Sequence, residues 1–247
     1  MNQNVQDPNK ASGIDDIPPR ILQLCADALY RPLHYLFNMS LRYGLIPTRW
    51  KVHKIVPVFK AGDPSSVKNY CPISLLSNIS KVLERLIFNK IISHVNTSIN
   101  PLQFGFTEKS STLQQMLLFT DSIFNHPSQT GVIYLDISKA FDTVSHSILL
   151  NKLWHFGITG TLWAWFKNYL SNRYQRVSIN NNLSNTLPVV SGVLQGSILG
   201  PVLFLIYMND VIFSIQHSQL LMYADDTKCF KHISSVTDQI HLQEDII

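Results

Sequence analysis

Cysteine is scarce in this chain of 247 residues: three are present, and no two of them are spaced as a CxxC pair. Both a cysteine zinc site and a disulfide framework are therefore unsupported. The N-terminal segment is polar and lacks the apolar core of a secretory leader. The most apolar stretch, residues 193–208, is interrupted by Gln195, Gly196 and Pro201, whereas a membrane span needs about 20 uninterrupted apolar residues. The sequence predicts an intracellular protein, nuclear or cytoplasmic and not secreted, without a membrane partner.

Charge is also sparse, with 15% charged residues, and the 20 Lys and Arg only slightly outnumber the 16 Asp and Glu. That surplus is too small to identify a nucleic-acid partner, although it does not oppose one. Apolar residues make up 45% of the chain, which is typical of a folded protein and excludes a disordered one. The length allows one large domain or two closely packed subdomains.

Hydrophobic periodicity predicts both helices and strands. Helices are expected at residues 18–46, 80–95, 147–156 and 161–170, from about Ser197, and from about Val236 to the end of the chain. Strands are expected at residues 54–60, 132–137, 175–179 and 184–190, with the last two forming a hairpin. The predicted fold class is α+β with an antiparallel sheet.

Aspartates follow two of the apolar stretches. Asp136 ends the run that begins at Gly131, while Asp225 and Asp226 lie at the expected tip of a hairpin. Strands that deliver carboxylates to a shared edge can hold two divalent metal ions, and paired ions support in-line phosphoryl transfer. A solvated turn or a helix cap is the alternative for any single aspartate. Together the three indicate nucleotide polymerisation.

Three motifs occur in the order that a known polymerase family uses. They are Tyr134–Asp142 (YLDISKAFD), Ser191–Pro201 (SGVLQGSILGP) and Tyr223–Asp226 (YADD). They resemble the motifs of reverse transcriptases, and the flanks at Trp50, residues 56–60, 69–74 and 104–106 are similar to the non-LTR (LINE, jockey-like) retrotransposon branch. The resemblance covers residues 12–247. It implies a right-hand polymerase with fingers and an N-terminal helical region in residues 1–130, a palm in 131–247 that is incomplete at its C-terminus, and no thumb.

The resemblance also implies a role for individual residues. Asp136, Asp225 and Asp226 would be catalytic and would bind two Mg²⁺ ions, with Mn²⁺ as a substitute, and Ile137 would add a backbone carbonyl ligand. The implied nucleotide-binding residues are Lys60, Phe141, Gln195 and Gly196. The implied partners are an RNA template, a DNA primer and deoxynucleoside triphosphates.

Two of these nucleotide-binding assignments have simple alternatives. Phe141 is expected to pack on the sugar and exclude a 2′-hydroxyl, but an ordinary core aromatic residue would look the same. Lys60 is expected to contact the triphosphate, although a solvated surface lysine is the alternative.

A basic segment lies between the first and second motifs. Lys167, Arg173 and Arg176 are interleaved with Tyr169 and Tyr174. Cations beside aromatic rings can follow template phosphates and stack on bases. We therefore treat this segment as a candidate template contact.

One departure from the family pattern leaves two hypotheses open. Cys71 stands where the family has an arginine that is expected to grip the triphosphate, and a thiol offers neither a permanent charge nor a bidentate fork. The first hypothesis is an RNA-directed DNA polymerase, a nucleotidyltransferase that extends a DNA primer on an RNA template. The second is a catalytically inactive, truncated remnant with at most weak nucleic-acid binding, which Cys71 and the missing thumb favour. An RNA-dependent RNA polymerase is disfavoured by the bulky Phe141.

Overall fold

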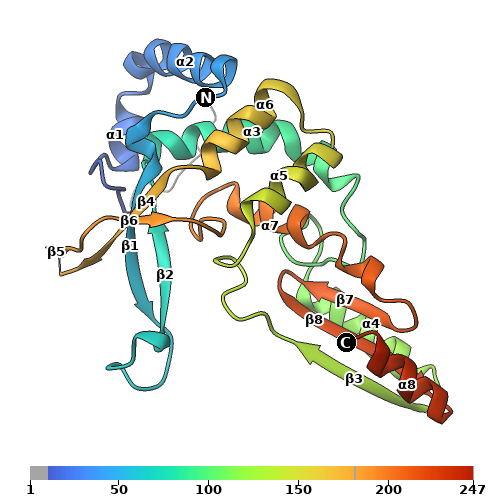
Figure 1. The fold of residues 1–247 in the computed structure, drawn as a ribbon. Coiled ribbons are helices and arrows are strands. Elements are labelled where there is room, and N and C mark those ends of the chain that lie inside the picture. The colour runs from blue at the N-terminus through green and yellow to red at the C-terminus, as the bar shows by residue number, and fades with distance from the viewer. Residues whose placement is uncertain (1–10, 181, 247) are drawn as a thin grey trace. The chain divides into compact units, whose positions relative to one another are not determined.

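A computed structural model describes residues 11–180 and 182–246 as two compact units (Figure 1). The first unit ends at Ile92 and resumes over Phe141–Pro201, and the second consists of Ser93–Ala140 and the chain from Val202 onward. Both units are therefore discontinuous in sequence, unlike the contiguous ranges 1–130 and 131–247 expected for fingers and palm. The assignment of those two subdomains stays a prediction.

The first unit contains one mixed sheet with helices. Its helices are α1 (Pro19–Leu24), α2 (Ala26–Tyr43), α3 (Asn78–Asn96, which runs beyond Ile92), α5 (His146–His155) and α6 (Gly160–Leu170), with short 3₁₀ turns at Thr48–Lys51 and Val67–Asn69. Its strands are β1 (Val52–Phe59), β2 (Tyr70–Leu75), β4 (Arg173–Ile179), β5 (Asn182–Leu183) and β6 (Leu187–Val189). The order is β2-β1-β4-β5, and β6 also pairs with β4. Strand β1 is antiparallel to β2 and parallel to β4.

Local sequence explains where the first helices begin and end. The expected helix over 18–46 is divided at Cys25, which lies outside helical geometry with φ −101° and ψ 17°. Helix α2 then ends at Gly44, which adopts a left-handed conformation (φ +64°) that glycine favours. Trp165 of α6 is buried and donates its indole N–H to Ser40 of α2 (3.0 Å), so this contact joins two helices of the core.

The second unit contains an antiparallel sheet in the order β3-β8-β7. Its elements are α4 (Thr112–Phe124), β3 (Gln129–Leu135), α7 (Gly200–Met208), a 3₁₀ turn (Val211–Ser214), β7 (Gln219–Tyr223), β8 (Asp226–Ile233) and α8 (Val236–Glu244). Alternate residues of β7 point to opposite faces, as a strand requires. Leu220 packs with Leu242 of α8, whereas Leu221 packs with Phe104 and with Phe230, which contacts α4.

The α+β class and the two predicted hairpins are confirmed, because β7 pairs with β8 and β4 with β6, both antiparallel. The last helix begins at Val236 as predicted, but its predicted continuation to residue 247 is wrong. It ends at Glu244, and Asp245 instead accepts the backbone N–H of Gln216 (2.8 Å). Residue 247 lies outside the described residues. Among the helices that the structure describes, none combines the length and the apolar character needed to cross a bilayer.

The core of the first unit encloses a histidine whose ring has no hydrogen-bond partner. His53 of β1 is fully buried, and both of its ring nitrogens are unpaired. Burial lowers the pKa of this imidazole to about 3, and the positive charge of Arg173 adds to the lowering. The ring is therefore neutral in the folded chain at neutral pH.

This burial predicts that acid destabilises the first unit. In the unfolded chain a histidine binds a proton near pH ~6.5, whereas His53 in the folded chain does so only near pH 3. Stability is therefore lost as the pH falls below the unfolded value, by about 2 kcal/mol at a pH of ~5. Urea unfolding at neutral and acid pH measures this loss, and His53→Met should remove it. Equal pH dependence in both proteins would contradict the prediction.

Candidate active site

The three predicted catalytic aspartates lie at one end of the sheet in the second unit. Leu135, the last residue of β3, pairs with Thr227 of β8. The next residue on each strand is an aspartate, Asp136 on one side and Asp226 on the other. Asp225 belongs to the two-residue turn of the β7–β8 hairpin. The backbone register therefore places three carboxylates, from two distant parts of the sequence, at one sheet edge.

The side chains at this edge are accessible to solvent. Asp136 and Asp226 are exposed, and Asp225 is half-buried. The backbone of Ile137, the implied carbonyl ligand, follows directly, and its side chain is 38% exposed. The carboxylate oxygens of the three aspartates do not all lie within 4.8 Å of one another in the described structure. Ligation of a shared ion would therefore require their side chains to rotate, which their exposure allows.

The turn that carries Asp225 has an unusual backbone conformation. Ala224 has φ +57°, in the left-handed region where two-residue hairpins normally place glycine or asparagine. Its N–H donates to Oε1 of Gln103 (2.8 Å), and its carbonyl accepts from Nε2 of the same side chain (3.1 Å). Gln103 is only 3% exposed. One buried amide group thus satisfies both backbone polar groups of Ala224 and fixes the turn.

The segment around Gln103 follows β7 closely. Phe104 donates its N–H to the carbonyl of Met222 (2.8 Å), and Met222 donates its N–H to Leu102 (2.9 Å). The N–H of Gly105 also donates to Oε1 of Gln103 (2.9 Å). A side chain at Gly105 would lie 2.9 Å from Cα of Ala224 and would overlap its nitrogen. This position therefore requires glycine.

Gln103 and Gly105 are site residues that sequence reasoning missed. Residues 104–106 served there only as a point of family resemblance. A glycine between two aromatic residues was the available signal, because such a glycine often marks close backbone approach. The partner of that approach, Ala224, lies too far along the chain to be identified from spacing.

In the first unit, Gln195 and Gly196 lie against β2. The carbonyl of Gln195 accepts the N–H of Ser74 (2.8 Å), and its side-chain Oε1 accepts the thiol of Cys71 (3.4 Å). Gly196 has φ +117°, and a Cβ there would lie 2.5 Å from the carbonyl oxygen of Ser74. Thus Cys71 directly contacts one of the predicted nucleotide-binding residues.

Glu84 of α3 anchors the same segment and was also missed. Its carboxylate accepts the N–H of Ile198 (2.9 Å) and the hydroxyl of Tyr169 (3.2 Å). The residue is 1% exposed, and burial raises the pKa of its carboxyl group. A glutamate on the buried face of a predicted helix was the available signal, since such residues are rarely buried unless paired.

The basic segment proposed as a template contact is wrong in part. Arg173 and Tyr169 are each 2% exposed. Arg173 donates to the backbone carbonyls of Tyr169 (2.9 Å) and Trp50 (3.1 Å), and its guanidinium lies 4.8 Å from the Tyr169 ring centroid. These two side chains are core residues: backbone carbonyls accept from both terminal nitrogens of the guanidinium, and a ring faces it, while its Nε has no hydrogen-bond partner.

The other two predicted nucleotide-binding residues also belong to the first unit. Lys60 is exposed directly after β1, and its N–H donates to the carbonyl of Asn69 (2.9 Å), which closes the β1–β2 hairpin. Phe141 is half-buried, and its carbonyl accepts the N–H of Val193 (2.8 Å). Their proposed contacts with the triphosphate and the sugar stay predictions.

Comparison with known proteins identifies the class of the chain. The model of the reverse transcriptase (RNA-dependent DNA polymerase) family matches residues 59–244, so the chain belongs to this family. The chain is 32% identical over 240 residues to the "RNA-directed DNA polymerase from mobile element jockey" of Drosophila melanogaster, covering 92% of this chain and 26% of that protein. It is 33% identical over 231 residues to the "Probable RNA-directed DNA polymerase from transposon X-element" of the same species, covering 90% and 25%.

A third relative extends this pattern. The "Probable RNA-directed DNA polymerase from transposon BS" of Drosophila melanogaster is 31% identical over 230 residues, or 88% of this chain and 25% of the relative. The chain thus spans about a quarter of each of these proteins. The predicted resemblance to jockey-like, non-LTR retrotransposon reverse transcriptases is confirmed.

Proposed function

We propose that this chain is a domain that performs RNA-directed DNA synthesis. It would extend the 3′-hydroxyl of a DNA primer on an RNA template with deoxynucleoside triphosphates, releasing pyrophosphate. The supporting observation is the register of the second unit's sheet, which puts Asp136 beside Asp226 and Asp225 in the adjoining turn. Because the chain belongs to the reverse transcriptase family, we assign these carboxylates to nucleotide addition.

The donor set fits a pair of Mg²⁺ ions. The carboxylates of Asp136, Asp225 and Asp226 and the carbonyl of Ile137 are all hard oxygen donors, which Mg²⁺ prefers. Such a pair of ions, when bound, supplies charge neutralisation at the attacking 3′-oxygen and at the leaving pyrophosphate. In this scheme Gln103 keeps the backbone of the turn fixed, and the side chain of Asp225 rotates to reach the ion.

The nucleotide would be selected and held by Lys60, Phe141, Gln195 and Gly196. Phe141 would exclude a 2′-hydroxyl by bulk, and Gln195 would use its amide group beside the templating pair. Gly196 leaves room for close approach because it carries no side chain. Lys60, exposed at the end of β1, would donate to the triphosphate.

Primer extension by the full chain tests this proposal. A labelled DNA primer on an RNA template, with deoxynucleotides and Mg²⁺ or Mn²⁺, should give extended products. EDTA should prevent them, and ribonucleotides should not replace deoxynucleotides. Absence of any metal-dependent product would reject a polymerase role for this chain.

One observation favours a second candidate function, a non-catalytic chain with weak affinity for RNA or single-stranded DNA. Cys71 stands where the resemblance implies an arginine, and its thiol contacts Gln195. A cation that could hold the triphosphate is therefore absent at this position. RNA binding without primer extension would be the result that this candidate predicts.

Introducing an arginine at position 71 tests whether the missing cation limits nucleotide binding. We expect Cys71→Arg to lower the apparent KM for deoxynucleotides about tenfold, because a charge-assisted hydrogen bond contributes about 1.5–3 kcal/mol. Steady-state extension at varied nucleotide concentration measures this change. Cys25→Arg is a matched control, since Cys25 is an exposed residue at the junction of α1 and α2. An unchanged KM in Cys71→Arg would mean that triphosphate contact at this position does not limit the reaction.

A further inference from the structure

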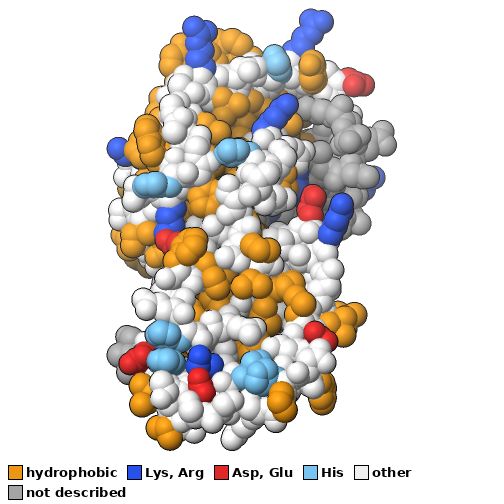
Figure 2. Space-filling model, turned by 90° about the vertical axis from the view of Figure 1, so that its right-hand side faces the viewer, with side chains coloured by type: hydrophobic (Ala, Val, Ile, Leu, Met, Phe, Trp, Pro, Cys, Tyr) orange, Lys and Arg blue, Asp and Glu red, His pale blue; other side chains and the backbone are white. Residues whose placement is uncertain are grey.

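A cluster of metal-ligand side chains lies in the second unit, away from the aspartates. Ligand atoms of His217, His241 and Glu244 all lie within 4.8 Å of one another, the one such group among the residues described. The two imidazole rings are stacked with centroids 4.2 Å apart, and Nε2 of His217 is 3.9 Å from Oε2 of Glu244. In the lower part of Figure 2, histidine side chains gather at the surface beside acidic and basic side chains. Local sequence patterns did not predict this group, because His217 lies on a different segment from His241 and Glu244.

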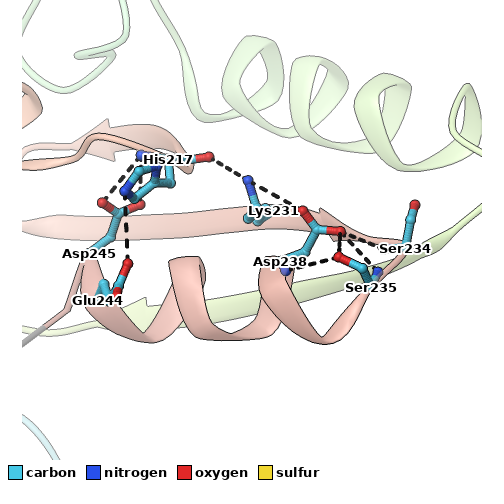
Figure 3. A network of polar contacts seen from close by, with 7 residues as sticks. All are labelled: His217, Lys231, Ser234, Ser235, Asp238, Glu244 and Asp245. Carbon is cyan, nitrogen blue, oxygen red and sulfur yellow. Dashed lines mark hydrogen bonds and ion pairs between the residues drawn. The ribbon is translucent and has the colours of Figure 1, made fainter.

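The backbone at His217 is held by Asp245, which directly follows α8, and by Lys231 of β8 (Figure 3). The N–H groups of Gln216 and His217 donate to the carboxylate of Asp245 at 2.8 and 3.1 Å. The carbonyl of His217 accepts from Nζ of Lys231 (2.9 Å), and Lys231 also lies 3.8 Å from Asp238. These contacts hold the loop before β7 against the helix that supplies the other two ligands. The fold therefore fixes the backbone positions of the three ligand residues.

The side chains themselves can adjust to an ion. His241 and Glu244 are three residues apart on α8, so they lie on the same face of the helix. His217 and Glu244 are exposed and His241 is half-buried, so rotation costs mainly the stacking of the two imidazole rings. Two donors on one tetrahedral Zn²⁺ lie about 3.3 Å apart, given bonds of about 2.0–2.1 Å. The present 3.9 Å between His217 and Glu244 needs to shorten only slightly.

A second stacked histidine pair in the same unit offers a contrast. The rings of His126 and His232 are 3.9 Å apart and nearly parallel. Both ring nitrogens of His232 are already engaged, by Ser122 (3.2 Å) and by Thr130 (2.9 Å). In the described part of the chain this pair is not grouped with a carboxylate. Paired imidazoles alone therefore do not make a site.

We propose that His217, His241 and Glu244 bind one divalent transition-metal ion of the zinc class. Two imidazole nitrogens and one carboxylate favour Zn²⁺ and similar ions, whereas Mg²⁺ prefers oxygen donors alone. The ion would cross-link the loop before β7 to α8, and three protein ligands leave a position for water. Because β7 leads into the β7–β8 hairpin, the ion stabilises the strand that ends at the turn with Asp225. This site is independent of the proposed polymerase activity.

Zinc titration of the full chain tests the proposal. Calorimetry in millimolar Mg²⁺, which occupies oxygen-only sites, should show one saturable Zn²⁺ equivalent. His241→Gln and Glu244→Gln should each weaken binding at least about tenfold, since even indirect changes around metal sites cost 10–100-fold. His126→Gln is the matched control and should leave the affinity unchanged. At one fixed zinc concentration, the melting temperature of the wild type should also rise by more than that of His241→Gln.

Two results would overturn this site. The first is a failure of the variants to differ: the wild type and His241→Gln bind zinc with equal affinity, or His126→Gln weakens binding as much as His241→Gln does. Either outcome indicates dispersed binding to surface histidines. The other comes from zinc-edge X-ray absorption of the wild-type chain, which needs no variant to fold. A spectrum without two imidazole ligands would exclude the proposed ligand set. Neither result depends on whether the chain extends primers.

Discussion

We expect Asp225→Asn to lower the rate of metal-dependent primer extension at least about a hundredfold, the usual cost of removing one group that stabilises transition-state charge. The substitution keeps the size and shape of the side chain but removes its negative charge, on which the affinity for a divalent cation depends. Asp225 is half-buried in a two-residue hairpin turn, so the substitution disturbs few packing contacts. Gel analysis of products over time measures the rate.

A matched control for this experiment is Asp121→Asn. Asp121 lies on α4 in the same unit, is exposed, and accepts a hydrogen bond from Asn125 (2.8 Å). The same charge is removed, but away from the edge that carries the three aspartates. This variant should extend primers at the wild-type rate. Equal rates for Asp225→Asn and wild type would refute the catalytic role of that carboxylate.

Gln103→Met should have the largest effect on stability, about 3 kcal/mol, because it leaves both backbone polar groups of Ala224 without their buried partner. The N–H of Gly105 loses its acceptor as well. Methionine conserves the volume of the side chain, so the effect is one of polarity. Urea unfolding measures the loss, and primer extension should fall with it because the turn is no longer fixed.

Gln115→Met provides the comparison for this prediction. Gln115 is another buried glutamine of the second unit, at 4% exposure. Its Oε1 accepts from Lys228 at 3.3 Å, but its Nε2 has no partner. Removing that amide should therefore cost clearly less than removing the amide of Gln103. If the two variants unfold at the same urea concentration, the contact with Ala224 does not stabilise the turn.

Local patterns were enough to predict the elements that carry the aspartates. The apolar run before Asp136 and the short hairpin around Asp225 are each defined by residues adjacent in sequence. The contact of Gln103 with Ala224 joins residues 121 positions apart, and no local pattern encodes it. Sequence reasoning therefore located the carboxylates but missed the side chain that fixes their turn.

The error at Arg173 has a related cause. A cation among aromatic residues suits either a nucleic-acid surface or a core, and the sequence alone does not distinguish them. Arg173 is buried because residues distant in sequence stabilise its charge there, namely the carbonyl of Trp50 and the carboxylate of Glu84. Arg176, three residues later, donates instead to the nearby carbonyl of Ser184 and stays accessible.

Two elements were missed although local signals existed. Helix α4 begins with a capping box in which Ser111 and Gln114 exchange hydrogen bonds, a pattern readable from sequence. Strand β2 contains Pro72, which argues against a central strand. The structure resolves this conflict, because β2 is at the edge of its sheet.

The first unit is built from two separate stretches of the chain, and this affects its folding during synthesis on the ribosome. Lys51, beside β1, donates to the carbonyl of Ser171, 120 residues later. At about 5–20 residues per second, the emerging N-terminal part waits roughly 6–24 s for these partners. During that interval the unpaired side of β1 is open to chaperones and to other nascent chains. Slowing translation between these two segments should therefore increase aggregation of the newly made protein.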